Sequence, residues 1–157
     1  TGTLPDTNIN NASLDNVTTL PAGVGGKVLQ VVTATDTTQR QTNSSSYVSA
    51  NISVNITPSS TSSKILVFYS TTIDGADGVN GVVVTLYRNG TNIGGGSNGM
   101  AQSYPRLSGA GINKLDSPST TSQVTYEVYF RIYSGSSNVE VNYVGSQGNL
   151  TAMEIQG

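Results

Sequence analysis

The chain of 157 residues contains no cysteine, no histidine and no tryptophan. Without cysteine it has no disulfide, no thiolate nucleophile and no zinc–thiolate site. Without histidine it lacks the usual general base near neutral pH and the commonest transition-metal ligand. These absences leave carboxylate chemistry or no catalysis. We expect no enzymatic activity, no cofactor and no metal-ligating residues, and a metal ion at the loops or at a trimer axis stays an open alternative.

Positive charge and long apolar runs are also scarce. Only seven residues are Lys or Arg, they are scattered singly along the chain, and the formal net charge is −2. Such a chain offers no basic patch to neutralise phosphates. The longest apolar runs, such as residues 82–84, are far shorter than the roughly 20 residues that cross a bilayer. We therefore expect no nucleic-acid partner and no insertion into a membrane.

Small polar residues dominate what is present. Ser, Thr, Asn and Gly make up 74 of the 157 residues, and these types are poor at forming helix interiors. Val, Ile, Leu and Phe account for 37 residues, above the roughly 20% below which chains tend to be disordered. The length suits one domain. The sequence therefore predicts a single folded domain built from β-strands.

Two segments, residues 46–56 and 123–133, alternate apolar and polar side chains as a strand with one buried face does. The side chains predicted to face the core are Val48, Ala50, Ile52, Val54, Ile56, Val124, Tyr126, Val128, Phe130 and Ile132. Further strands are predicted over residues 28–34, 64–69, 81–88, 91–93, 138–144 and 150–155.

The connections between these strands carry three further predictions. Asn89-Gly90 is a strong signal for a two-residue hairpin turn. Residues 94–121 are predicted to form a long loop with one irregular strand at most, and residues 138–144 to be the hairpin partner of 123–133. Residues 64–69 are apolar on both faces, which is typical of a strand that is central or lies at an interface.

About eight strands without a helix predict an all-β fold over residues 27–157, a two-sheet antiparallel jelly-roll sandwich. An immunoglobulin-like sandwich is the alternative. Residues 1–26 contain spaced aliphatic side chains with no helix or strand period, so we expect an extended leader. It is either a flexible linker or a thread that docks on a partner chain.

Glu127 and Glu140 are the carboxylates to test for catalysis, because they are predicted on neighbouring strands. Glycosidases place two carboxylates about 5 to 10 Å apart. Arg131 is expected on the same face as Glu127, which favours a surface ion pair instead. Asp74-Gly-Ala-Asp77-Gly lacks the spacing of an EF-hand and indicates a turn rather than a calcium loop.

Tyrosines gather on the non-core face of residues 123–133 and its predicted neighbour. A tyrosine-rich sheet face suits a subunit interface or a ligand platform. We predict a subunit interface formed by Leu66, Phe68, Tyr129, Tyr133 and Tyr143. Binding residues favour loops held on a rigid scaffold, and the predicted recognition surface consists of Asp74, Asp77, Asn80, Tyr104, Arg106, Lys114 and Asp116.

Five stretches are distinctive as a set: TGTLPDTNI, LPAGVGGKVLQVV, ITPSSTSSKILVFYS, LYRNGTNIGGG and LTAMEI. Together they resemble the C-terminal region of tail-fibre and related structural proteins of tailed bacteriophages, and the resemblance covers essentially the whole chain. It implies a homotrimeric jelly-roll head, similar to the tumour-necrosis-factor fold, with the leader running from a shaft into the head. It carries no catalytic residue, and it suggests that Thr1 is not the native start.

The function expected from the residues and the resemblance together is that of a virion-surface protein, the distal head of a tail fibre. It would bind a glycan or protein of the host cell surface through its loops and other virion proteins through its leader. The alternative within the structural class is a capsid decoration or head-fibre protein. The alternative from another class is a polysaccharide depolymerase that uses Glu127 and Glu140.

Overall fold

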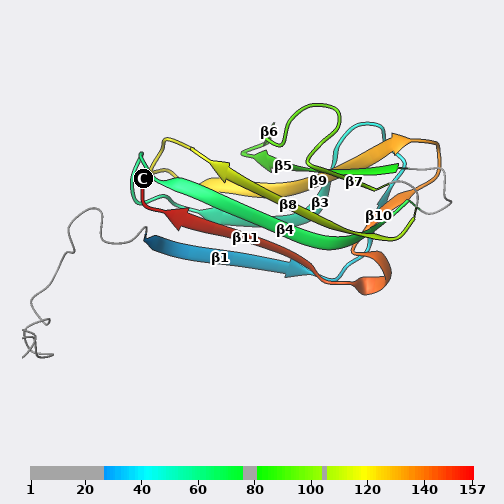
Figure 1. The fold of residues 1–157 in the computed structure, drawn as a ribbon, viewed down its shortest axis with the longest axis horizontal. Coiled ribbons are helices and arrows are strands. Elements are labelled where there is room, and N and C mark those ends of the chain that lie inside the picture. The colour runs from blue at the N-terminus through cyan, green and yellow to red at the C-terminus, as the bar shows by residue number, and fades with distance from the viewer. Residues whose placement is uncertain (1–26, 76–80, 104–105) are drawn as a thin grey trace, which may run out of the picture.

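The computed structural model describes residues 27–75, 81–103 and 106–157, in which the chain forms two antiparallel β-sheets packed face to face (Figure 1). In these ranges the chain contains eleven strands, a short 3-10 segment and no α-helix, so no helix there is long and apolar enough to cross a membrane. The predicted all-β fold is confirmed. The predicted leader, residues 1–26, lies outside the described residues.

The first sheet, sheet A, has four rows of strands. The four long strands are in the order β1, β11, β4 and β8. The short strand β10 pairs with the end of β4 beyond β11, and the short strand β2 pairs with β10. The strands are β1 (Val28–Asp36), β2 (Arg40–Thr42), β4 (Lys64–Asp74), β8 (Ser108–Asp116), β10 (Val139–Val141) and β11 (Gly148–Ile155). Because β4 is paired along both edges, it is a central strand of its sheet, which is one of the two alternatives predicted for this segment.

The second sheet, sheet B, has the order β3, β9 and β5, with the two short strands β6 and β7 on the free edge of β5. Its strands are β3 (Val48–Ile56), β5 (Gly81–Arg88), β6 (Thr91–Asn92), β7 (Ala101–Ser103) and β9 (Val124–Ser134). The turn between β5 and β6 is confirmed at Asn89 and Gly90, whose φ angles are 47° and 79°, the positive values that a type I′ turn requires.

The core lies between the two sheets. All the side chains predicted to face it from β3 and β9 are buried except Val48, which is half-buried. Sheet A contributes alternate residues of its strands from the opposite side, the largest being Tyr69, Ile65 and Ile73. Because side chains alternate between the two faces of each strand, the packed sheets bury one face each and leave the other face directed outward.

Two sequence predictions are wrong. Residues 94–121 were expected to form a long loop with one irregular strand at most, but they contain two strands, β7 and the regular β8, which pairs with β4 over nine residues. The alternation of apolar and polar side chains in β8 is not evident in the sequence, because the outward positions include Gly109 and Gly111 and the inward positions include Ala110. Residues 139–141 were expected to pair with β9 but belong to sheet A as β10. Valines at 139 and 141 face a core in either sheet, so the pattern does not identify the partner.

The two ends of the molecule differ. At one end, the entry end, β1 begins beside the last residues of β11 and the first residue of β4, so Val28, Ile155 and Lys64 lie together. At the other, the far end, β4 finishes beside the start of β8, so Ile73 lies opposite Ser108. Figure 1 shows the C-terminus and the start of β1 at the same end.

Candidate functional site

The outer face of sheet A carries a row of apolar side chains that crosses four strands. The pairing register places Val31 of β1 opposite Met153 of β11, Met153 opposite Leu66 of β4, and Leu66 opposite Leu115 of β8. Phe68 stands two residues further along β4, and Val28 and Ile155 lie at the entry end of the row. We call these seven side chains the apolar strip.

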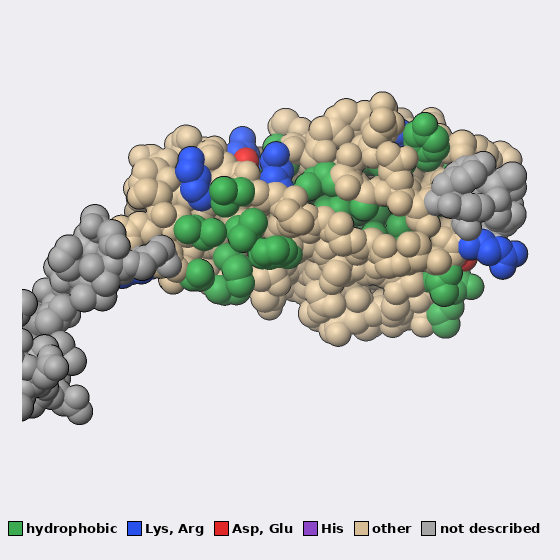
Figure 2. All heavy atoms as spheres, in the orientation of Figure 1, with side chains coloured by type: hydrophobic (Ala, Val, Ile, Leu, Met, Phe, Trp, Pro, Cys, Tyr) green, Lys and Arg blue, Asp and Glu red, His purple; other side chains and the backbone are tan. Residues whose placement is uncertain are grey.

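The strip is open to solvent. Leu115 is 57% exposed, Val28 is 55% exposed and Phe68 is 42% exposed. Figure 2 shows hydrophobic side chains gathered over the half of this face nearer the entry end. Monomeric soluble proteins rarely expose contiguous apolar patches of this kind, and those that do use them mostly for binding.

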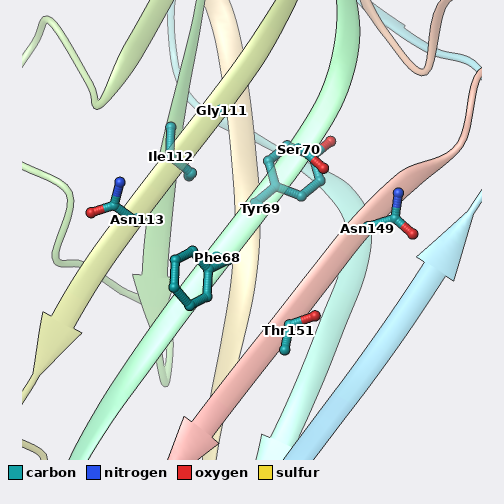
Figure 3. A pocket seen from close by; sticks show the side chains of 8 residues that line it. All are labelled: Phe68, Tyr69, Ser70, Gly111, Ile112, Asn113, Asn149 and Thr151. Carbon is teal, nitrogen blue, oxygen red and sulfur yellow. The ribbon is translucent and has the colours of Figure 1, made fainter.

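An open hollow of about 420 Å³ adjoins the strip (Figure 3). Phe68 forms one wall, and the polar lining comes from Ser70, Asn113, Asn149 and Thr151. Gly111 also lines the hollow, and a Cβ added there would meet no atom within 4 Å. The outer face of sheet A thus combines an apolar ridge with a neighbouring depression.

The outer face of sheet B, in contrast, is covered over β5 by its own chain. Val83 and Thr85 point outward from β5 but are fully buried, because residues 93–100 pack over them. The Met100 amide donates to the Val84 carbonyl at 2.8 Å. At Gly99, where φ is +59°, an added Cβ would lie 2.6 Å from that same carbonyl oxygen, so the close approach requires glycine.

Tyrosines pack beside this cover, whereas the outward residues of β3 are polar and mostly exposed. The rings of Tyr87 and Tyr129 stack with centroids 3.9 Å apart, and Tyr47 meets Tyr87 edge-on at 6.1 Å. The Arg131 guanidinium lies 5.2 Å from the centre of the Tyr47 ring. Burial, followed by the nearby Glu127 carboxylate, raises the pKa of Tyr129. Tyr129 is therefore held by contacts within its own chain.

The residues predicted for a subunit interface lie in three places. Leu66 and Phe68 belong to the apolar strip on sheet A, whereas Tyr129 and Tyr133 lie on the outer face of sheet B. Tyr143 is in the 3-10 segment Tyr143–Gly145, between β10 and β11, and not in a strand as predicted. On one subunit these side chains do not form a single patch.

Sequence reasoning missed most of the strip and part of the tyrosine cluster. Leu115 was missed because β8 was not recognised. Tyr87 had a usable signal, since it alternates with the core residues Val82, Val84 and Leu86. For Val31 and Met153 the signal of an interaction surface was weaker, since it consisted only of apolar residues at outward positions of strands.

The predicted recognition residues are also separated. Asp74 and Asp116 are buried strand ends, 8% and 9% exposed, and not the outward loop residues that were expected. Asp116 lies at the entry end, where it accepts hydrogen bonds from Arg88 and from the Tyr126 hydroxyl, both at 2.7 Å. Burial, followed by the hydrogen bond to Asp116, raises the pKa of Tyr126.

The other recognition residues are placed differently or lie outside the described ranges. Arg106 is exposed near the start of β8, and Lys114 is half-buried within that strand. Asp77, Asn80 and Tyr104 are outside the described residues.

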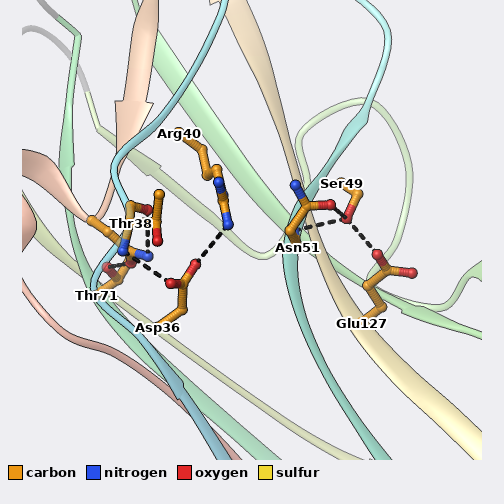
Figure 4. A network of polar contacts seen from close by, with 8 residues as sticks. Asp36, Thr38, Arg40, Ser49, Asn51, Thr71 and Glu127 are labelled. Atoms are coloured by element: carbon orange, nitrogen blue, oxygen red, sulfur yellow. Dashed lines mark hydrogen bonds and ion pairs between the residues drawn. The ribbon is translucent and has the colours of Figure 1, made fainter.

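The two carboxylates considered for catalysis lie in different sheets. Glu127 is on the outer face of sheet B and accepts a hydrogen bond from the Ser49 hydroxyl (Figure 4). Glu140 is in β10 of sheet A and accepts one from the Gln41 amide. The prediction that they occupy neighbouring strands is wrong, because β10 pairs with β2 and β4.

Arg131 also departs from its predicted ion pair with Glu127. It donates to the backbone carbonyls of Ile132, at 2.7 Å, and of Ser97. The ion pairs among the described residues join Arg40 to Asp36 at 3.3 Å, as Figure 4 shows, and Arg88 to Asp116.

Within residues 27–75, 81–103 and 106–157, no group of three or more Asp, Glu, His or Cys side chains lies close enough together to hold a metal ion. The exposed apolar strip and the hollow beside it make the outer face of sheet A the strongest candidate site for an interaction. The chain matches no family model, and a search of curated proteins finds no similar sequence.

Proposed function

We propose that this chain is a structural protein of a bacteriophage virion, the distal head of a homotrimeric tail fibre that adsorbs to the host cell by binding a surface glycan or protein. The class of protein comes from the sequence resemblance. The apolar strip is the observation that carries the proposal, because it is a surface suited to assembly.

The strand order supports a jelly roll. Along the chain, β1 and β2 lie in sheet A, β3 in B, β4 in A, β5 to β7 in B, β8 in A, β9 in B, and β10 and β11 in A. Apart from the step from β5 to its neighbours β6 and β7, consecutive rows therefore lie in opposite sheets, as in a jelly roll, whereas an immunoglobulin-like sandwich joins several consecutive strands within one sheet.

Further copies of the same chain are the proposed occupants of the apolar strip. On sheet B, residues 93–100 and the tyrosine cluster cover the outer face over β5 and the exposed outward residues of β3 are polar, so the apolar strip on sheet A is the surface proposed for packing. The strip also begins at Val28, the second residue after the leader of residues 1–26. Three strips packed around one axis would bring three leaders together at the entry end, where a shaft would join the head.

This arrangement directs the far end away from the shaft. Arg106 is exposed there, and Asp77, Asn80 and Tyr104 follow or precede the strands that finish there, so these four are the proposed receptor-binding residues. Three copies of a weak site on one head raise the effective concentration of the site after the first contact.

Light scattering on the purified chain tests the assembly. We expect a solution mass near three times 16.2 kDa, and a mass of one chain for the double variant Leu66→Thr, Leu115→Thr, which removes apolar contact area while keeping residues suited to strands. Tyr133→Thr is the matched control, because Tyr133 is 51% exposed on the other sheet. A monomeric wild-type protein at micromolar concentration would overturn the trimer.

Binding of the labelled protein to a panel of bacterial cells tests the adsorption role. We expect binding to some strains, weakened by Arg106→Ala and lost when the trimer is dissociated. A trimer that binds no cells but binds phage capsids would replace this role with that of a decoration or head-fibre protein.

A further inference from the structure

Three oxygen-bearing side chains form a row across sheet A at the far end. The register places Glu140 of β10 directly opposite Asp74 of β4 on one side and directly opposite Gln41 of β2 on the other. Residues directly opposite one another on antiparallel strands point to the same face, with Cβ atoms about 4.5 to 5.5 Å apart. Val139 and Val141 face the core, so Glu140 and its two neighbours lie on the outer face.

Both carboxylates of this row are shielded from water. Glu140 is 7% exposed and Asp74 is 8% exposed. Like charges directly opposite one another destabilise a sheet, and buried charges are costly unless they are paired. A positive group at this place would remove both costs.

The chain itself does not supply that positive group. It has no histidine, and all seven of its Lys and Arg residues lie in the described ranges. Their ion pairs are those of Arg40 with Asp36 and of Arg88 with Asp116. Neither Asp74 nor Glu140 therefore has a Lys or Arg side chain within ion-pair distance.

One carboxylate oxygen is also left without a partner. Oε1 of Glu140 accepts a hydrogen bond from Gln41, but Oε2 is buried and has no hydrogen-bond partner. A buried carboxylate oxygen in this state normally has an ion or a donor beside it. Because the register places Glu140 directly opposite Asp74 on the same face, the open oxygen belongs to a carboxylate that neighbours the Asp74 carboxylate.

We infer that Asp74 and Glu140 bind a calcium ion. Two carboxylates balance its charge, and neutral oxygens of the amide, backbone or water type complete the shell. Calcium accepts six to eight oxygen ligands in irregular geometry, whereas magnesium demands a near-octahedral shell, so a site that spans two strands suits calcium better. The ion would fasten the end of β4 to β10, whatever the chain binds elsewhere.

Isothermal titration calorimetry on the chelator-treated full chain, with calcium chloride as the probe, tests the inference. We expect one calcium ion per chain and a rise in the Tm on adding millimolar calcium. Asp74→Asn and Glu140→Gln should each weaken binding about tenfold or more. Glu127→Gln is the matched control, since Glu127 also accepts one short side-chain hydrogen bond but lies in the other sheet, and it should bind calcium like the wild type.

A second measurement on the wild type locates the ion without a variant. Calcium should shift the amide NMR signals of Gln41, Asp74 and Glu140 more than those elsewhere. Absence of binding at millimolar calcium, or shifts confined to another region, would overturn the inference.

Discussion

Glu154 shows how a single side chain holds the entry end together. It is fully buried in β11 and accepts hydrogen bonds from the Gln30 amide at 2.5 Å, the Ser59 backbone amide at 2.7 Å and the Ser59 hydroxyl at 2.6 Å. Gln30 belongs to β1, and Ser59 to the connection between β3 and β4. One carboxylate thus links three segments that are distant in sequence.

The stability of the protein should fall in acid because of this residue. Burial alone would raise the pKa of Glu154, but the hydrogen bonds from Gln30 and Ser59 outweigh it and lower the pKa to about 2. A lowered pKa stabilises the folded state above the unfolded value of 4.5, and this stabilisation is lost as the pH falls from 4.5 towards 2. Glu154→Gln should cost about 2 kcal/mol at pH 7 and reduce the loss below pH 4.5. Urea denaturation of both proteins across this range measures the effect, and equal stability at pH 7 would contradict it.

The two ion pairs should differ in value because their surroundings differ. Asp116→Asn leaves Arg88 without its counter-ion and disturbs the buried Tyr126 hydroxyl, so we expect a loss of about 3 kcal/mol in the free energy of unfolding. Asp36→Asn breaks a longer, more exposed pair with Arg40, and its loss should be about 1 kcal/mol or less. Chemical denaturation of the two variants provides the comparison, and similar losses would show that burial of Asp116 is not what matters.

At the scale of elements, residues 93–100 act as a cover for sheet B. They return over β5 through the backbone bonds of Ile93, Gly94 and Met100. Two glycines allow this approach: a Cβ on Gly94 would reach within 2.7 Å of the Met100 side chain, and one on Gly99 would strike β5 itself. The cover explains why outward-facing valine and threonine on β5 are buried.

Gly99→Ala should destabilise the protein by about 1 to 3 kcal/mol, because the methyl group must displace the backbone of β5 or its own loop. Gly111→Ala is the control, since its methyl group would enter open space, and we expect a change within about 0.5 kcal/mol. Thermal unfolding of both variants measures the difference. A tolerated Gly99→Ala would mean that the loop does not pack tightly on the strand.

For the whole molecule, the decisive feature is the contrast between sheet B, whose outer face is covered over β5 and polar on β3, and sheet A, whose outer face carries the exposed apolar strip. Burial of the seven side chains of the apolar strip removes apolar surface from water, which is favourable. The strip begins near the residue where the leader joins the domain. An assembly that buries this face links folding to association, because copies that associate when folded stabilise the folded state by mass action.

The Tm of the wild-type protein should therefore rise with protein concentration. The double variant Leu66→Thr, Leu115→Thr should abolish this dependence with little effect on the fold of the single chain, since both side chains point outward from sheet A. Calorimetry over a hundredfold range of concentration distinguishes the two proteins. A Tm independent of concentration in the wild type would contradict association through this face.

The sequence by itself determined the all-β fold, the core-facing sides of β3 and β9, and the turn at Asn89-Gly90. These are local properties: alternation of period two is set by neighbouring residues, and positive φ angles depend on the turn residues themselves. Only the tertiary structure decided which strands pair, because valines that face a core fit the core side of either sheet. Pairing placed β10 in sheet A, separated Glu127 from Glu140, and brought Glu140 opposite Asp74, 66 positions earlier in the chain. The tertiary structure also decided that β5 is covered on its outer side, because this cover depends on where the glycine-rich residues 93–100 pack and not on the sequence of β5.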